Sequence, residues 1–95
     1  MSEAGTRAAL KEQINGQDLV IGVPLRHGLG YGLQFGQTPP RNPNIAFWYG
    51  AGGSMVFNDL ENRLTITFVM NQMLPGLVMM ERTDGLVDAV YQSIA

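Results

Sequence analysis

Few side chains in this sequence could carry out acyl-transfer chemistry, and Ser54 is the first of them. The run Gly52-Gly53-Ser54-Met55-Val56 can be compared with the Gly-x-Ser-x-Gly nucleophile elbow, a sharp turn between a strand and a helix. The last glycine of that motif is missing, and a strand is expected after Ser54. His27 is the sole histidine, and no spacing places it beside Ser54 with an orienting carboxylate. Ser54 is therefore expected to be a turn hydroxyl bonded to local backbone, and a miniature hydrolase using Ser54 and His27 is the least favoured hypothesis.

The other polar candidates do not suggest a second catalytic or metal site. One histidine without a partner at a ligand spacing is poor evidence for a metal ion, and the chain has no cysteine for thiolate chemistry or disulfides. Asp59 and Glu61, with Arg63 nearby, are expected to form a solvated, partly ion-paired hairpin end. The glycines of residues 28–32 lack the spacing of a dinucleotide fingerprint. We predict neither a metal nor a cofactor.

Residues 48–50 are the strongest candidate for a functional surface. Trp48 and Tyr49 end a predicted strand, and Gly50 opens a glycine-rich stretch in which backbone N–H groups lie beside aromatic surface. Strand ends of this kind bind extended ligands and can supply oxyanion donors. The alternative is that Trp48 and Tyr49 only pack on the two faces of a sheet.

The hydrophobic pattern that must position these residues predicts an α+β fold. The expected elements are helices over 2–13 and 83–94, strands over 28–36, 45–49, 54–57 and 63–70, and a short extended piece over 18–23. Ser2 is the expected cap of the first helix. The buried face of the last helix is predicted to hold Leu86, Val87, Val90, Tyr91 and Ile94. These elements make an antiparallel sheet of three to four strands flanked by N- and C-terminal helices.

Composition describes a small, weakly charged chain that can fold. Its 95 residues, 45% hydrophobic and 15% charged, suit a single modest core. A net charge of −2 and six scattered basic residues give no footprint for nucleic acid. No apolar stretch approaches the ~20 residues that span a bilayer, and the first residues lack a signal-peptide pattern. We expect a soluble, cytoplasmic protein with no nucleic-acid partner and no membrane span.

Three stretches of the sequence together resemble one known family, although each is a weak signal by itself. They are Gly28-Leu-Gly-Tyr-Gly-Leu33, the run over residues 48–61, and Phe68-Val-Met-Asn-Gln-Met73. They resemble the C-terminal third of β-lactamase-related serine esterases, the family VIII carboxylesterases and their penicillin-binding-protein-like relatives, and residues 86–91 are similar to the last helix of that family. The resemblance covers essentially the whole chain. It implies a part of the β-lactamase-like fold, with residues 1–95 as a single partial domain.

The resemblance also implies where a site would lie. In that family a Ser-x-x-Lys pair supplies nucleophile and base, Tyr-x-Asn supplies a second proton-transfer group, and Lys-Thr-Gly or a replacement lines the cleft from a strand. Trp48-Tyr49-Gly50 stands at the third motif and would line the substrate cleft, and Ala51 would offer the backbone N–H that completes the oxyanion hole. Relatives often carry histidine in place of Trp48, and the tryptophan favours ester over penicillin-type substrates.

The first two family motifs are absent. Lys11 is the only lysine and the residue three before it is Ala8, and no tyrosine is followed two residues later by asparagine. The resemblance therefore implies a fragment of a β-lactamase-like serine esterase with no catalytic residue of its own, inactive alone, whose parent acts on an ester. Its expected partners are the missing N-terminal portion of the hydrolase or a second copy, because an isolated sheet leaves an unpaired edge. The alternative is a small non-enzymatic binding or dimerising protein that uses the strand edge over residues 48–54.

Overall fold

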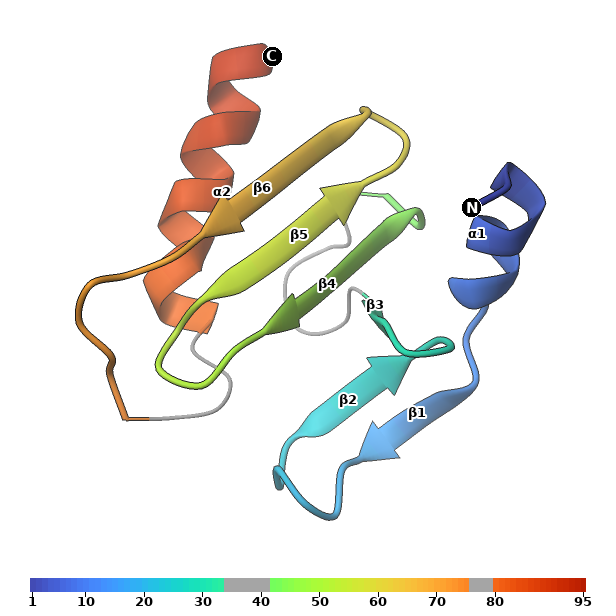
Figure 1. The fold of residues 1–95 in the computed structure, drawn as a ribbon, viewed down its shortest axis with the longest axis horizontal. Coiled ribbons are helices and arrows are strands. Elements are labelled where there is room, and N and C mark those ends of the chain that lie inside the picture. Colours follow the sequence, from blue (N-terminus) through green and yellow to red (C-terminus); the bar gives the residue numbers. More distant parts are fainter. Residues whose placement is uncertain (34–41, 76–79) are drawn as a thin grey trace.

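Apolar residues that alternate with polar ones, separated by glycine- and asparagine-containing turns, fold most of the chain into one antiparallel meander (Figure 1). The computed structural model describes residues 1–33, 42–75 and 80–95. Its elements are α1 (Glu3–Ala9), β1 (Ile14–Gln17), β2 (Pro24–His27), β3 (Gly32–Leu33), β4 (Ile45–Tyr49), β5 (Met55–Asp59), β6 (Leu64–Phe68) and α2 (Met80–Ile94). The strands follow chain order, β1 to β6, each antiparallel to the next. The predicted α+β class is confirmed, with six strands in place of three to four.

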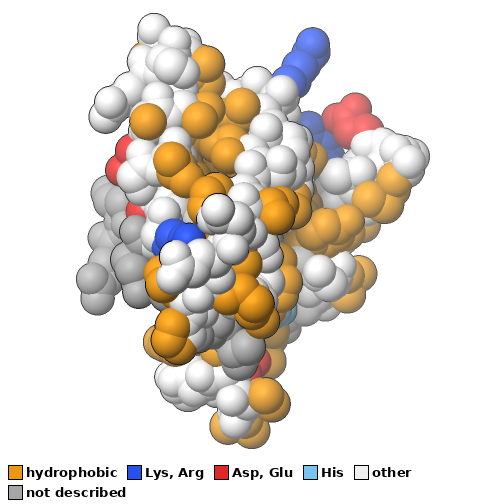
Figure 2. All heavy atoms as spheres, turned by 60° about the vertical axis from the view of Figure 1, so that its left-hand side comes forward, with side chains coloured by type: hydrophobic (Ala, Val, Ile, Leu, Met, Phe, Trp, Pro, Cys, Tyr) orange, Lys and Arg blue, Asp and Glu red, His pale blue; other side chains and the backbone are white. Residues whose placement is uncertain are grey.

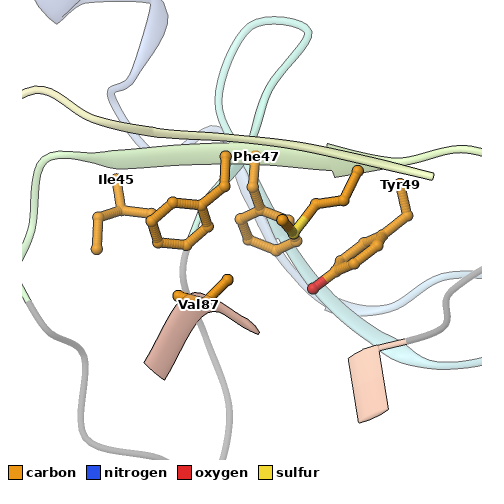
Figure 3. Packing of buried hydrophobic residues seen from close by; sticks show 6 residues of the cluster. Ile45, Phe47, Tyr49 and Val87 are labelled. Carbon is orange, nitrogen blue, oxygen red and sulfur yellow. The ribbon is translucent and has the colours of Figure 1, made fainter. Parts of the chain in front are cut away.

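The core lies between β4–β5 and α2. Strand β4 occupies the predicted residues, and alternation places Ile45, Phe47 and Tyr49 on the face toward α2, where Val87 meets them (Figure 3). Met55 and Phe57 of β5 complete this buried cluster, which Ile66, Phe68 and Tyr91 partly cover. Burial of these large side chains is the main stabilising contribution, at about 1.5–3 kcal/mol for each fully buried side chain.

Helix α2 presents a different face to the sheet from the one predicted. Val87 is 5% exposed and Thr83 is fully buried, whereas Leu86 is 45% and Ile94 is 55% exposed. Thr83, Val87 and Tyr91 are four residues apart and so stand above one another on one side of the helix. The prediction of Leu86 and Ile94 as core residues was therefore wrong. The pattern alone left a wide apolar stripe, and contact with β4 and β5 selected one half of it.

The N-terminal helix is shorter than predicted. Ser2 caps α1 as expected, since its hydroxyl accepts a hydrogen bond from Gly5 N at 3.1 Å. The helix ends at Ala9 rather than near Gln13, and Ile14–Gln17 forms strand β1. None of the α1 side chains is buried, so no packed apolar face supports a longer helix.

The predicted extended piece over 18–23 is the connection of a hairpin between β1 and β2. The carboxylate of Asp18 accepts hydrogen bonds from Val20 N at 2.8 Å and Ile21 N at 2.7 Å, and Gly22 has φ +78°. An aspartate that bonds the next backbone N–H groups, followed by a glycine in the left-handed region, stabilises a tight reversal. The strand therefore begins at Pro24, where the prediction ended it.

Only a part of the predicted strand over 28–36 is a strand. Gly28 N donates to Tyr31 O at 2.9 Å, so residues 28–31 form a turn, and Leu29 is 60% exposed. Leu29 N donates to Ala9 O at 2.8 Å, which brings the end of α1 against this turn. A Cβ at Gly28 would lie 2.2 Å from that same Ala9 oxygen, so the contact requires glycine. Residues 34–36 and most of the predicted loop over 37–44 lie outside the described residues.

The face of the sheet away from α2, here called the outer face, is only partly covered. Ala46 is buried there and lines a hollow of about 470 Å³ together with Thr6 of α1 and Leu10, the residue that caps the end of α1. Trp48 and Val56 remain 40% and 46% exposed. Figure 2 shows another side of the molecule, the left of Figure 1 where α2 lies, and hydrophobic side chains are spread over it with few charged groups among them. No described helix is both long and apolar enough to cross a membrane.

Candidate functional site

The candidate site is the glycine hairpin, residues 50–54, which joins β4 to β5 directly after Trp48 and Tyr49. Gly50 N donates to Ser54 O at 2.8 Å, and Gly53 N donates to Gly50 O at 3.2 Å. Gly52 and Gly53 have φ values of +86° and +113°, in the region that favours glycine. The sequence Gly-Ala-Gly-Gly-Ser is thus the local reason why β4 reverses so tightly.

Ala51 is exposed at the tip of this hairpin. Within residues 1–33, 42–75 and 80–95 its N–H donates no hydrogen bond, whereas the N–H groups of Gly50 and Gly53 are both engaged. An exposed backbone N–H held at a strand end by a tight turn is the kind of donor that stabilises an oxyanion. The structure therefore leaves this donor available at the position that the family resemblance assigns to it.

Trp48 lies on the outer face of β4 beside His27 of β2. The two rings meet edge to face, with centroids 5.0 Å apart and an interplanar angle of 82°. Nε2 of His27 is buried and has no hydrogen-bond partner in the described part of the chain. Sequence reasoning did not pair these residues, because the contact depends on the register of three strands and no local pattern reports it.

The last two residues of β4 form an open step in the sheet. The register between β3 and β4 pairs Gly32 with Phe47 and Leu33 with Ala46 and goes no further. On the other side, Trp48 and Tyr49 pair with Val56 and Met55 of β5. Among the described residues, Trp48 and Tyr49 therefore have a strand partner on one side only. Of the edge predicted over residues 48–54, only Trp48 and Tyr49 belong to a strand, whereas residues 50–54 form the hairpin that leads to β5.

Tyr49 points away from Trp48 into the core. Its side chain is 8% exposed, and its ring packs on Phe47 with centroids 5.5 Å apart. Burial raises the pKa of the Tyr49 hydroxyl, a hydrogen bond with Thr83 opposes this, and the charge of Asp84 adds to it. The side chains of Trp48 and Tyr49 therefore cannot line one surface, and only the Tyr49 backbone lies beside Trp48 and Gly50.

Ser54 has the surroundings of a turn residue. A Cβ at Gly50 would come within 2.2 Å of Ser54 Oγ, so the hydroxyl occupies the space above this glycine. The expected hydrogen bond from the hydroxyl to local backbone is absent from the described residues. No hydrogen bond joins Ser54 to His27, whose ring packs on Trp48. The structure thus does not bring the two residues of the least favoured hypothesis together.

Asp59 is buried at 1% exposure, so the expectation of a solvated hairpin end was wrong for this residue. Its carboxylate accepts hydrogen bonds from Asn42 Nδ2 at 2.9 Å, Asn62 Nδ2 at 2.8 Å, the backbone N–H groups of Glu61 and Asn62 at 3.0 Å each, and the Tyr91 hydroxyl. We call these residues the Asp59 cluster. Burial alone would raise the pKa of Asp59, but the donors from Tyr91, Asn62 and Asn42 outweigh it and hold the pKa below its usual value.

The Asp59 cluster lies at the far end of β5 from the glycine hairpin, because that strand begins at Met55 and ends at Asp59. Its donors come from the segment before β4, the turn after β5 and helix α2. The cluster therefore fixes those parts to one another, away from the candidate site. No group of three or more His, Cys, Asp or Glu side chains that could hold a metal ion occurs among the residues that the structure describes.

Comparison with known proteins relates this geometry to a family. No protein-family model and no curated protein matches the chain. The crystal structure of a family VIII carboxylesterase does match it, with a TM-score of 0.85 and 32% sequence identity over 97% of this chain. The chain spans 25% of the length of that protein. In sequence and in fold, the chain therefore corresponds to one quarter of a family VIII carboxylesterase, and its meander with two helices is a part of the β-lactamase-like fold.

Proposed function

We propose that residues 1–95 are the C-terminal part of a β-lactamase-like serine esterase domain and supply its oxyanion side. In this proposal Ala51 N–H binds the oxyanion, and Trp48 and the Gly50 backbone line the ester cleft. The nucleophile and its base come from residues outside this segment, so the chain alone is inactive. The observation that carries the proposal is that Ala51, two residues after the end of β4, is exposed and that its N–H donates no hydrogen bond to any described residue.

The chemistry follows from where negative charge develops. Attack on an ester carbonyl turns its oxygen into an oxyanion, and a fixed backbone N–H that points at this oxygen stabilises the transition state more than the ground state. The open step at Trp48 and Tyr49 would let an extended acyl group lie along β4 beside this donor. Trp48 would present an apolar side chain to the substrate, which suits a neutral ester.

A chimera tests the role of Ala51. Residues 1–95 replace the matching quarter of the family VIII carboxylesterase, and hydrolysis of a p-nitrophenyl ester is measured. We expect Ala51→Pro, which removes the N–H, to lower kcat roughly 10²–10³-fold, as for the loss of one oxyanion donor. Ala51→Ser keeps the N–H and is the matched control, with near-normal kcat. Equal activity of the two variants would show that Ala51 N–H does not bind the oxyanion.

Labelling tests the absence of a nucleophile. The 95-residue chain is treated with a fluorophosphonate serine probe and its intact mass is recorded, after dispersed amide resonances have shown that it is folded. We expect no adduct, because Ser54 has no base beside it among the described residues. A stoichiometric adduct that Ser54→Ala abolishes would overturn the proposal and make Ser54 the nucleophile.

A second candidate function is a non-enzymatic protein that binds an extended partner or a second copy along the open step of β4. The observation that favours it is that, in the part of the chain that the structure describes, Trp48 and Tyr49 have no strand partner on the β3 side. Strand addition would satisfy the backbone groups at that edge. An inactive chimera, together with protection of the Trp48 and Tyr49 amides on association, would favour this function over the first.

A further inference from the structure

The glycine hairpin is contacted by two later parts of the chain, the segment after β6 and helix α2. Gly52 O accepts hydrogen bonds from Leu74 N at 3.1 Å and from Arg82 Nη1 at 3.3 Å. The same Nη1 donates to Gln72 O at 2.9 Å, and the Arg82 guanidinium lies 5.6 Å from the centroid of the Phe68 ring. Arg82 of α2 therefore joins the hairpin, the segment after β6 and β6 itself.

Met73 completes this support through packing. A Cβ at Gly52 would come within 2.7 Å of Met73 side-chain atoms, so the thioether side chain lies directly against the glycine. Among the residues described, the segment after β6 thus contacts Gly52 by one backbone hydrogen bond and by packing, while Arg82 contacts it by a side chain 30 positions away. Glycines lose more conformational freedom on folding than other residues, so a hairpin with three of them needs outside contacts to hold one conformation.

The hydrogen bonds connect the Arg82 contact to Ala51 through two peptide planes. Every peptide bond that the structure describes is trans, so the C=O of one residue and the N–H of the next point in opposite directions. With Gly52 O held by Leu74 N and by Arg82 Nη1, the N–H of Gly53 points the other way, to Gly50 O at 3.2 Å. With Gly50 O directed into the hairpin, the N–H of Ala51 must point out of it.

We propose that Arg82 is a positioning residue that aims the Ala51 N–H out of the glycine hairpin through these two peptide planes. The conformational part of this inference stands by itself, and its consequence for catalysis rests on the proposed function. Arg82 suits the task because its planar guanidinium can donate two N–H groups of one nitrogen to two carbonyls, those of Gly52 and Gln72. These two hydrogen bonds connect the hairpin and the segment after β6 to α2, the helix that covers the core.

The direct test measures the direction of the N–H bond. Residual dipolar couplings of ¹⁵N-labelled chain report the orientation of Ala51 and Gly53 N–H, and solvent-exchange rates report the Gly53 hydrogen bond. The variants are Arg82→Met, which keeps a long apolar stem over Phe68, and Arg82→Lys, which keeps the charge and a donor. Arg7→Met is the matched control, since Arg7 pairs with Glu3 on the exposed surface of α1.

Arg82→Met removes the hydrogen bond from the charged Arg82 donor to Gly52 O. Because the peptide plane of Gly52 and Gly53 is then held less firmly, we expect the exchange rate of Gly53 N–H to rise about tenfold, the effect of losing a hydrogen bond from a charged donor. The dipolar coupling of Ala51 N–H should average toward zero. Arg82→Lys should restore part of both values, and Arg7→Met should change neither. Strand amides of β4 and β5 should keep their exchange rates in all variants. If Arg82→Met and Arg82→Lys leave the Ala51 coupling and Gly53 exchange unchanged, or raise exchange equally throughout the sheet, the inference is wrong.

Activity of the chimera separates this inference from the proposed function. If Ala51 N–H binds the oxyanion, Arg82→Met lowers kcat with little change in KM, and Arg82→Lys recovers part of the loss. A normal kcat in Arg82→Met, with the Ala51 coupling averaged, would keep Arg82 as the positioning residue and remove Ala51 from the oxyanion site. The opposite outcome would have two parts. Arg82→Met would leave the Ala51 coupling unchanged, and kcat would be normal in Ala51→Ser but low in Ala51→Pro. This would keep Ala51 N–H at the oxyanion and remove Arg82 as its positioning residue.

Discussion

Some single residues in this chain have surroundings that combine local contacts with contacts to distant segments. Asp59 is the clearest case, since a carboxylate that the local pattern places in an exposed turn is buried and accepts five hydrogen bonds. A buried charge is tolerated only where such donors replace the water that it loses. His27 contrasts with it, because its buried Nε2 has no partner in the described residues and its ring packs on Trp48.

Removing the charge of Asp59 should destabilise the protein. We expect Asp59→Asn to lower the free energy of unfolding by about 2–4 kcal/mol at pH 7, because hydrogen bonds to charged groups are lost and donors from Tyr91 and Asn42 are left without an acceptor. Glu61→Gln is the matched control and should change stability by less than about 0.5 kcal/mol, since Glu61 is exposed. Urea unfolding followed by circular dichroism provides both values.

The difference in stability between the wild type and Asp59→Asn should depend on pH. The pKa of Asp59 is lowered in the folded state, so its contribution is present above the unfolded-state pKa, about 3.9, and is lost as the pH falls through the folded pKa. The stability difference between wild type and Asp59→Asn should therefore be constant near neutrality and shrink below about pH 4. A difference that stays the same down to pH 2 would show that the Asp59 charge does not stabilise the fold.

Among elements, β4 and α2 carry most of the architecture. Both were predicted from the local sequence, β4 from a run of apolar residues and α2 from helical spacing. The buried face of α2 was not predicted, because a helix with apolar residues over a wide arc can pack on either half of that arc. The sheet selects the half with Thr83 and Val87 and leaves Leu86 outside. The same helix supplies Arg82 to the glycine hairpin and Tyr91 to the Asp59 cluster. Helix α2 thus contacts the chain at both ends of strand β5.

Two neighbouring substitutions test which face of α2 is buried. Val87→Ala should lower the free energy of unfolding by about 2 kcal/mol, from lost apolar burial and a small cavity. Leu86→Ala should cost less than about 0.5 kcal/mol although it removes more atoms, because Leu86 is 45% exposed. Chemical denaturation of both variants in one buffer gives the two free energies of unfolding. A larger loss of stability for Leu86→Ala would mean that α2 packs on the sheet with the Leu86 side and not with the Val87 side.

At the scale of the whole molecule, the sheet formed by the described residues has two edge strands without a further strand partner and one face that is only partly covered. Strands β1 and β6 end the strand order, and the outer face carries exposed Trp48 and Val56. The family VIII carboxylesterase that this chain resembles is four times as long, since the chain spans 25% of it. Free strand edges and exposed apolar surface favour association with another chain. We therefore expect the 95-residue chain to self-associate.

A lysine on the edge strand should weaken this association. Thr67 is exposed on β6, and a charge on an edge strand opposes pairing with a second copy. The average mass from sedimentation velocity should rise with concentration for the wild type, and Thr67→Lys should shift it toward the monomer. Gln92→Lys adds the same charge on the exposed side of α2 and should leave association unchanged. A wild type that stays monomeric at high concentration, or equal masses for the two variants, would contradict this use of β6.

The sequence by itself determined the α+β class, strands β4 to β6 and the presence of α2, because each depends on periodicity within 5 to 15 residues. It also determined the resemblance to family VIII carboxylesterases, which the structural match supports. Glycines at 52 and 53 marked the hairpin for the same reason, since positive φ is a local property of the backbone.

Only the tertiary structure decided the features that join distant residues. Strand β1 exists because β2 pairs with it, and the helical pattern before it gave no sign of this pairing. The His27–Trp48 contact, the Asp59–Tyr91 bond and the Arg82 contact with Gly52 link positions 21, 32 and 30 residues apart. Their energies depend on strand register and helix rotation, which are properties of the packed chain, and a side chain's own neighbours in sequence cannot report them.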